Sequence, residues 1–249
     1  MRFNGREVSV AAFDVLWQAA VGGIGKPSVL QCGSPGATDA ERARVEARAA
    51  VELRAAGYAG PRGPGEDVLA GLALLAQPPL AVDVRLFERA SAVPGALPAP
   101  TKRGTRLAVG GSTGVAAVLG PSGFRAWSFP KSSLVNEVIA LFGHHEPPNR
   151  IPGGVAIDVD QLYAPARKGN VEALLRQLEK PFLRRAHVCA LVRDRIVGRT
   201  DVLADLTLND IDTGRYLVFT DRNQIVITPG NRVTLERKLK DVIGSRRQY

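Results

Sequence analysis

Two short glycine-containing runs have the residue types that phosphate or calcium chemistry requires. The run Gly110–Gly114 (GGSTG) resembles a phosphate-binding loop, and Asp210–Gly214 (DIDTG) resembles the start of a calcium loop. A phosphate loop needs a helix immediately after it to aim backbone amides at the anion, but here a strand is expected to follow. In the calcium pattern Gly214 replaces the third acidic ligand, and the closing glutamate is absent. We therefore interpret both runs as turns between strands.

Zinc and acid–base chemistry are the other candidates. The run His144–Glu146 lies in a linker, and His187 and Cys189 would share one face of a strand. No second pair stands at metal-ligand spacing, so we interpret these as a linker pair and a buried strand histidine. Asp158 and Asp160 near a strand end are typical of helix caps. No sequence signature supplies a nucleophile with its base. The sequence thus predicts a protein that is not an enzyme, with no catalytic residue, no metal and no cofactor.

Composition and charge limit the function classes further. The chain has 249 residues, 45% of them hydrophobic, and a formal charge of +9. No apolar run approaches the roughly 18 residues that a membrane span requires, and the first seven residues lack the apolar core of a signal peptide. We therefore expect a cytoplasmic protein without membrane insertion. Its two cysteines, Cys32 and Cys189, lie far apart in sequence and are most simply two reduced thiols.

The positive charge keeps one alternative open, a basic nucleic-acid-binding protein. A basic stripe could be formed by Arg184, Arg185, Arg193 and Arg195. However, the chain has only two tryptophans and four tyrosines, and no strand interleaves aromatic with basic residues to stack bases. We therefore disfavour nucleic acid as the partner.

The elements that position these residues follow the same order twice: short strands, a proline, then an amphipathic helix. In the first copy, strands at 104–110, 115–119 and 124–129 lead through Pro130 to a helical stripe of Leu134, Val135, Val138, Leu141 and Phe142. In the second, strands at 187–193, 200–208, 215–220 and 224–228 lead through Pro229 to Val233, Leu235, Leu239, Val242 and Ile243. Proline has no N–H to donate, so it ends the ladder and sets the first helical turn.

The segments before each copy are less regular. The first half begins with a strand at 6–10, a helix from Phe13 to Ala20 and a second helix, opened by a Thr38–Glu41 capping box, that ends near Gly57. A helix at 66–76, a half-solvated strand around 82–86 and a flexible excursion at 90–103 follow. Proline and glycine concentrate at 143–154. Beyond it we expect a strand at 155–157, a helix at 160–166 and another capped by Asn170.

Runs of strands framed by helices predict an α+β fold with a central, largely antiparallel sheet. We expect two halves, residues 1–143 and 155–249, that share this sheet through a pseudo-twofold axis, are flanked by helical bundles and form one compact domain. A duplicated architecture without catalytic chemistry points to a binding surface.

Two helical segments carry a resemblance to a known family. They are Thr38–Gly57 (TDAERARVEARAAVELRAAG) and Val68–Pro78 (VLAGLALLAQP), and further similarity lies in Val15-Leu16-Trp17 and in Gly214-Arg215-Tyr216. This pattern looks like the EspG family, the ESX-secretion-associated proteins of actinobacterial type VII secretion. The resemblance spans most of the chain through the order and spacing of soft, apolar motifs.

The resemblance implies a cytosolic chaperone without enzymatic activity. Such a protein binds the PPE subunit of a PE–PPE heterodimer, covers an aggregation-prone tip and keeps the cargo soluble for secretion; a homodimer is left open. The family has no binding motif that transfers residue by residue. We therefore chose contact candidates physically, as strand residues able to face a sheet surface or supply its charged rim. These partner-binding candidates are Arg106, Arg125, Arg193, Arg195, Leu206 and Leu208.

Overall fold

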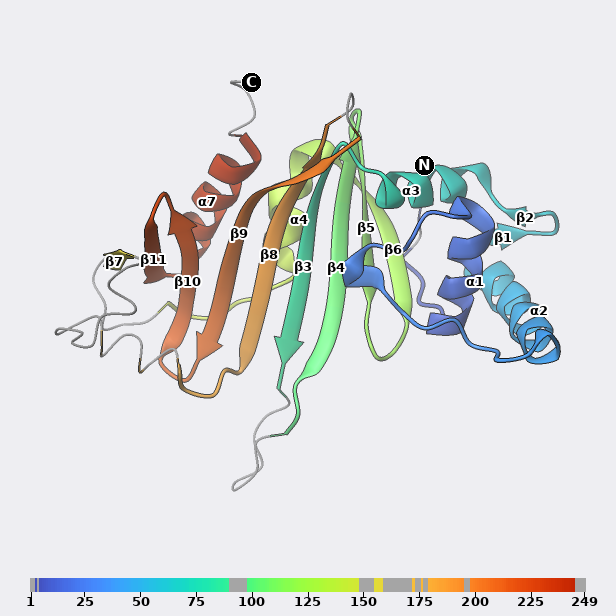
Figure 1. Cartoon of the computed structure of the whole chain (residues 1–249), viewed down its shortest axis with the longest axis horizontal. Helices are drawn as coiled ribbons and strands as arrows, with labels where there is room; N and C mark the ends of the chain where they lie inside the picture. Colours follow the sequence, from blue (N-terminus) through green and yellow to red (C-terminus); the bar gives the residue numbers. More distant parts are fainter. Residues whose placement is uncertain are drawn as a thin grey trace. The chain divides into compact units, whose positions relative to one another are not determined.

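The structure is a computed structural model of the chain. It describes residues 3, 5–89, 98–147, 155–158, 172, 176, 179–194 and 198–244. Helices and antiparallel strands occur together (Figure 1), which confirms the predicted α+β class. Within these ranges, no helix combines the length and the apolar character needed to cross a membrane.

In the part of the chain that the structure describes, nine strands form one sheet with the hydrogen-bonded order β6-β5-β4-β3-β8-β9-β10-β11-β7. The strands are β3 (Leu80–Glu88), β4 (Thr101–Gly110), β5 (Thr113–Leu119), β6 (Phe124–Pro130), β7 (Val155–Asp158), β8 (Arg184–Arg193), β9 (Thr200–Ile211), β10 (Gly214–Asp221) and β11 (Gln224–Pro229). Strands β3 and β8 are neighbours in the middle of the sheet. From β3, the strands β4, β5 and β6 follow in chain order toward one edge, and from β8, the strands β9, β10 and β11 follow in chain order toward the other. This is the strand order that a pseudo-twofold repeat predicts, so the repeat is confirmed in the topology.

The chain divides into two compact units, each made of separate stretches of sequence. Unit 1 comprises Met1–Val84, Arg103–Leu134 and Leu191–Asp201, and unit 2 comprises Arg85–Lys102, Val135–Ala190 and Val202–Tyr249. The divisions fall within β3, β4, β8 and β9. Each unit therefore takes residues from both halves of the sequence.

Unit 1 holds the three N-terminal helices. They are α1 (Val10–Val21), α2 (Asp39–Ala56) and α3 (Glu66–Ala76), with a small hairpin of β1 (Ala59–Gly60) and β2 (Gly63–Pro64) between α2 and α3. The predicted capping box is present, because the Thr38 hydroxyl accepts from the Glu41 N–H at 3.2 Å and the Glu41 carboxylate accepts from the Thr38 N–H at 3.3 Å. Gly57 then ends α2 at a φ of 79°, a left-handed value that glycine adopts without steric cost.

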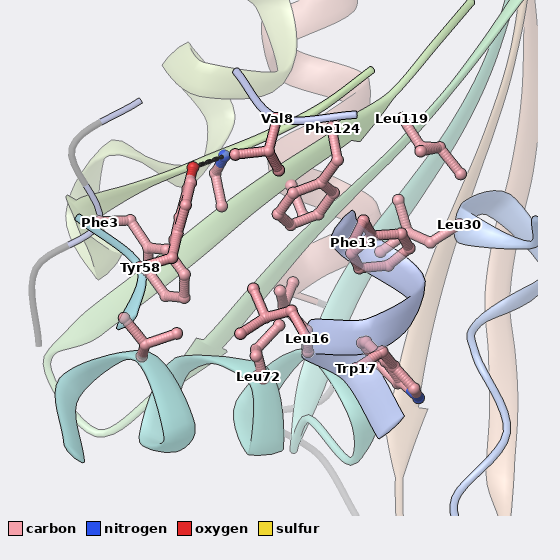
Figure 2. Close-up of a cluster of buried hydrophobic side chains, with 14 of the residues drawn as sticks. Phe3, Val8, Phe13, Leu16, Trp17, Leu30, Tyr58, Leu72, Leu119 and Phe124 are labelled. Atoms are coloured by element: carbon pink, nitrogen blue, oxygen red, sulfur yellow. Dashed lines mark hydrogen bonds between the residues drawn. The ribbon is translucent and has the colours of Figure 1, made fainter. Parts of the chain in front are cut away.

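The core of unit 1 lies between these helices and the strands β4 to β6. Figure 2 shows its aromatic centre, where the rings of Phe13 and Phe124 stack with centroids 4.1 Å apart. Leu16 and Leu72 are fully buried beside them. The Tyr58 hydroxyl donates to the Arg6 carbonyl at 2.7 Å and accepts from the Ala126 N–H at 3.2 Å, so a buried polar atom is satisfied on both sides. This core fixes α1 and α3 on one face of the strands.

The N-terminal segment corrects one prediction. Instead of a strand at 6–10, a single bridge joins Val8 to Phe124 on β6, and α1 starts at Val10. Ser9 caps this helix, because its hydroxyl accepts from the Ala12 N–H at 3.1 Å. Phe3 packs so closely on Gly71 of α3 that a Cβ there would lie 2.0 Å from its ring. The segment therefore lies along the outer strand β6 as an irregular cover.

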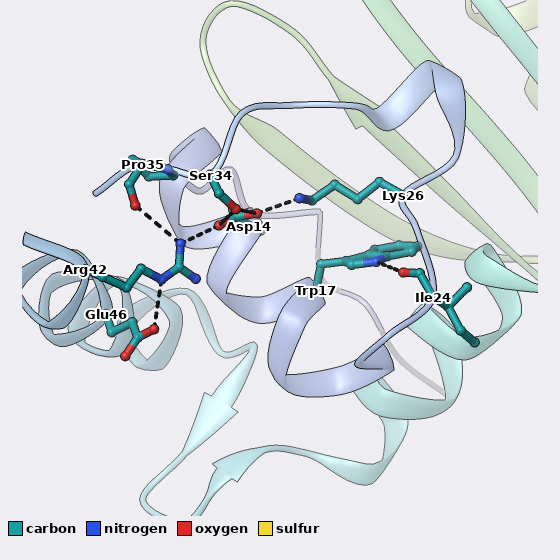
Figure 3. A network of polar contacts seen from close by, with 8 residues as sticks. All are labelled: Asp14, Trp17, Ile24, Lys26, Ser34, Pro35, Arg42 and Glu46. Atoms are coloured by element: carbon teal, nitrogen blue, oxygen red, sulfur yellow. Dashed lines mark hydrogen bonds and ion pairs between the residues drawn. The ribbon is translucent and has the colours of Figure 1, made fainter. Parts of the chain in front are cut away.

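A buried carboxylate anchors the loop that follows α1. Figure 3 shows Asp14 accepting from the Lys26 ammonium at 2.5 Å, from the Arg42 guanidinium at 2.7 Å and from the Ser34 hydroxyl. Burial alone would raise the pKa of Asp14, but these bonds outweigh it and hold the pKa below its ordinary value. The network ties α1 to α2 and to the loop between them.

Unit 2 holds the helices that follow the two strand runs. They are α4 (Leu134–Ala140), preceded by a 3-10 turn at Lys131–Ser133, and α7 (Arg232–Gly244), except that the first residue of α4 and the turn before it belong to unit 1. In α4 and just beyond, Val138 and Phe142 of the predicted stripe are fully buried. In α7, Leu235 and Leu239 are buried, but Val233 is 75% exposed and the prediction for it is wrong. Val233 lies two residues before Leu235, and residues two apart do not share a helix face.

Both glycine-containing runs are turns between strands, as predicted. The run Gly110–Gly114 joins β4 to β5, and Asp210–Gly214 joins β9 to β10. The helix expected at 160–166 and most of the one after Asn170 lie outside the described residues, as do residues 90–97 of the expected excursion.

Candidate partner-binding face of the sheet

Strand β8 has two chemically different faces. One carries the buried side chains of Ala186, Val188 and Ala190. The other carries Arg185, His187 and Cys189, all half-buried. His187 and Cys189 do share a strand face, as the alternation predicts. Among the described residues, no group of three metal-binding side chains surrounds them.

Strand β9 repeats this division. Leu206 and Leu208 are 3% and 0% exposed, and they pair across the ladder with Phe219 and Leu217 of β10. The opposite face carries Asp205, Thr207 and Asn209, of which Asp205 is exposed and Thr207 half-buried. We call the face of β8 and β9 that carries Arg185, His187, Cys189, Asp205, Thr207 and Asn209 the open face.

Hydrogen bonds hold the open face together across β8 and β9, which lie side by side in Figure 1. The Arg185 Nε–H donates to the Asn209 side-chain oxygen at 2.6 Å, and Nδ1 of His187 lies 3.2 Å from the Thr207 hydroxyl. The Phe87 ring of β3 meets the His187 ring edge-on, with centroids 6.1 Å apart. Burial lowers the pKa of His187, the positive charges of Arg185 and Arg85 lower it further, and Asp205 opposes them. The open face is thus preformed by contacts within the chain.

At one end of the open face, two arginines share one aromatic ring. The guanidinium carbons of Arg89 and Arg185 lie 4.8 and 4.6 Å from the centroid of Phe182. Arg89 follows β3 and Phe182 precedes β8, and these segments are joined by a bond from the Arg89 N–H to the Leu183 carbonyl at 2.9 Å. We call Arg89 and Arg185 the arginine pair. The face of an aromatic ring attracts cations electrostatically, so Phe182 stabilises both guanidinium groups.

The candidates chosen from the sequence do not all reach a surface. Arg106 is 8% exposed and holds Asp83 of β3 through two bonds of 2.7 Å, which also corrects the expected half-solvated strand, since Asp83 is buried. Leu206 and Leu208 are buried on the face opposite to the open face. These three side chains are therefore not available on the surface of the chain as it stands.

The other three candidates have different surroundings. Arg193 is half-buried and lines a small pocket with Arg106, Gln77 and Pro78 in unit 1. Arg125 is exposed on β6, and its guanidinium carbon lies 5.5 Å from the centroid of the Trp127 ring. Arg195 lies outside the described residues. A partner role for Arg125 and Arg193 stays a prediction.

The basic stripe considered for nucleic acid is divided between two faces. Arg184 pairs with Glu88 at 2.8 Å and donates to the Phe142 carbonyl beyond α4, whereas Arg185 belongs to the open face. Consecutive strand residues point to opposite sides of a sheet, so the two cannot line one surface.

Sequence reasoning missed Arg89 and Phe182 entirely. Its nearest signal was the alternation of Arg185, His187 and Cys189 with small apolar residues, which marks a less covered face of β8. The approach of Arg89 needed the β3–β8 pairing, which no local pattern contains.

Comparisons with known proteins agree with this architecture. The fold is similar to that of the Mycobacterium tuberculosis type VII secretion system chaperone EspG5, solved in complex with a PE25–PPE41 dimer. The two chains are 18% identical, the TM-score is 0.66, and the match covers 96% of each chain. No curated protein matches this chain. A model of the EspG family matches residues 9–241, almost the whole length of the sequence. The chain belongs to the EspG family.

Proposed function

We propose that this chain is a cytoplasmic chaperone of type VII secretion. It binds the PPE subunit of a PE–PPE heterodimer and keeps the dimer soluble until export. The observation that carries this proposal is the family match over residues 9–241, together with a fold shared over 96% of the chain with a chaperone solved in complex with a PE–PPE dimer. The function is binding, and it requires no catalytic step.

The open face supplies a physical basis for such binding. Its side chains are held by bonds within the chain, so little conformational freedom is lost when a partner covers them. The half-buried rings of Phe87 and Phe182 contact this face, and the arginine pair adds positive charge at one end of it. Apolar surface rimmed by charge is typical of protein-binding sites. An exposed tip of the cargo would be shielded from water by this face.

Co-expression with PE–PPE pairs encoded beside the gene tests the proposal. We expect at least one pair to co-purify with the chain as a ternary complex of defined mass in size-exclusion chromatography with light scattering. The same PE–PPE pair expressed without the chain should aggregate. Failure of every neighbouring pair to bind, with a folded chain in each experiment, would contradict the chaperone function.

The alternative, nucleic-acid binding, makes a different prediction. A protein that neutralises several phosphates loses affinity steeply as salt rises, because counterions are released on binding. We expect no such salt-dependent binding to random duplex or single-stranded DNA at low ionic strength. A steep salt dependence combined with no cargo binding would favour the alternative.

A further inference from the structure

The arginine pair carries positive charge that the described part of the chain does not neutralise. Nη1 of Arg89 donates to the Pro98 carbonyl at 2.6 Å, and Nε of Arg185 donates to the Asn209 amide oxygen. Both acceptors are neutral. Nε of Arg89 is buried and has no hydrogen-bond partner among the described residues. Among the described residues, no carboxylate forms an ion pair with either guanidinium.

This arrangement is costly for an isolated protein. Burial lowers the pKa of Arg185, and the charge of Arg89 lowers it further, so the two guanidinium groups repel each other in a half-buried place. A buried donor without an acceptor loses the hydrogen bond that water would give it. Stacking on Phe182 offsets part of this cost but supplies no counter-charge.

Other inward-facing arginines of the molecule show what the arginine pair lacks. Arg106 forms two bonds with Asp83, and Arg215 forms two bonds of 2.7 and 2.8 Å with Asp210. In both cases an aspartate takes the guanidinium fork, which matches the two oxygens of a carboxylate. The arginine pair has the same donor groups, but no carboxylate of the described residues pairs with them.

We propose that the arginine pair, stacked on Phe182, is a carboxylate-binding site, and that the cargo fills it with an aspartate or glutamate side chain. The second part rests on the proposed function. A bound carboxylate would accept hydrogen bonds from the guanidinium groups and remove their mutual repulsion. Because the site is half-buried, the ion pair would be screened less by salt than a surface contact.

A fluorescent hexaglutamate peptide tests the site without any cargo. Its binding is measured by fluorescence anisotropy with the full chain and with Arg89→Gln, Arg185→Gln and Arg185→Lys. The matched control is Arg48→Gln, which removes one positive charge from the exposed face of α2. We expect each glutamine variant to weaken binding about tenfold or more, since a charge-assisted bidentate contact is lost, and Arg48→Gln to change it less than about twofold.

The lysine variant separates recognition from charge and from misfolding. Arg185→Lys keeps the charge but loses the fork, so we expect its affinity to lie between those of wild type and Arg185→Gln. Circular dichroism confirms that each variant is folded. Equal weakening in Arg48→Gln and Arg185→Gln would show general attraction only and would overturn the inference. Lack of hexaglutamate binding by the wild type would also overturn it.

Two further outcomes decide what occupies the site. If a single-stranded oligothymidylate binds more tightly than hexaglutamate, and Arg185→Gln abolishes that binding, the site takes phosphate and the inference is overturned. In the co-expression experiment, we expect Arg185→Glu to lose the ternary complex, and an acidic-to-lysine change on the PPE tip to restore it. A complex that Arg185→Glu leaves intact would overturn the cargo contact while the proposed function stands. If the wild type binds no PE–PPE pair, the proposed function fails, and hexaglutamate still decides the carboxylate site.

Discussion

Arginines meet the sheet in two different ways at two places, one in unit 1 and one in unit 2. In unit 1, Arg106 is paired twice with Asp83 and also donates to the Leu75 carbonyl near the end of α3 at 3.0 Å. In unit 2, the arginine pair stacks on Phe182, and the acceptors that the described residues give it are neutral. In the first arrangement, an aspartate neutralises the arginine within the fold, and the arginine also joins a strand to a helix. In the second, the guanidinium groups keep positive charge and donors for a partner outside the chain. The difference teaches that pairing separates a structural arginine from one available for binding.

The largest expected effect tests the paired arginine. Arg106→Met leaves the Asp83 carboxylate buried without its partner, so we expect a loss of about 3–5 kcal/mol in the free energy of unfolding. The double variant Arg106→Met/Asp83→Leu removes both charges and should recover most of that loss. Urea denaturation of the two variants measures the difference. If the single and double variants are equally unstable, packing rather than charge pairing explains the role of Arg106.

A second variant tests whether the stability that an arginine contributes depends on its unit or on its pairing with an aspartate. Arg215 lies in unit 2 but is paired with Asp210, and it also donates to the Phe142 and Gly143 carbonyls beyond α4. We therefore expect Arg215→Met to cost about 3–5 kcal/mol as well, measured in the same urea series. A loss below about 1 kcal/mol, the usual size for a surface ion pair, would mean that arginines in unit 2 simply matter less.

A carboxylate in unit 1 provides an intermediate effect. Asp14→Asn removes the charge that Lys26 and Arg42 share, and we expect it to cost about 1–3 kcal/mol at pH 7. Because the folded-state pKa of Asp14 is lowered, its stabilisation is complete above the ordinary aspartate pKa of about 3.9 and disappears as pH falls through the folded value. Wild type and variant should therefore differ in the free energy of unfolding at neutral pH and become alike at acid pH. Asp241→Asn, an exposed change on α7, should show no such convergence.

The unpaired arginines should behave in the opposite way. Arg185→Gln relieves repulsion with Arg89 and keeps a donor for Asn209, so we expect the free energy of unfolding to stay within about 0.5 kcal/mol of wild type, on the stabilising side. Thermal unfolding at low salt is the measurement. A loss comparable to that of Arg106→Met would show that Arg185 is structural and would remove the contrast between the two regions.

The smallest effect is a change in titration. Since burial and then the positive charge of Arg185 lower the pKa of His187, Arg185→Gln should raise that pKa, which NMR of the ring protons can follow. A lowered histidine pKa means that protonation favours the unfolded chain, so this group withdraws stability as pH falls below about 6.5. An unchanged pKa of His187 would show that the charge of Arg185 does not act on His187 within the open face.

The sequence predicts elements whose signals are local. Thr38 and Glu41 specify a helix start by themselves, and Gly57 specifies its end, so α2 appears as expected. Pro130 and Pro229 mark the end of each strand run for the same reason. Val233 was misplaced because an apolar residue near a stripe was assigned to it without its phase on the helix. The irregular segment before α1 was misread because Ser9 caps the helix instead of extending a strand.

The candidate site was less predictable because its contacts are not local. Arg106 looked available because a basic residue in a strand is usually exposed, and nothing near it in sequence reveals Asp83 across the sheet. Leu206 and Leu208 were placed on the wrong side because alternation gives the two faces of a strand but not which one is covered. The fold class follows from patterns along the chain, whereas the arginine pair exists only once β3 and β8 are neighbours.

The N-terminal segment has a consequence for how the molecule avoids its own copies. Strand β6 ends the sheet on one side, and Gly5 and Val8 engage its outer edge through bonds from the Gly5 N–H to the Ala126 carbonyl and between Val8 and Phe124. Without this segment, the freed backbone groups would form a template for another strand. Shortening the N-terminus should therefore appear first as self-association that grows with protein concentration, before any loss of secondary structure. The shortened chain would lack the strip that covers β6, the edge at which a second copy of the chain could pair.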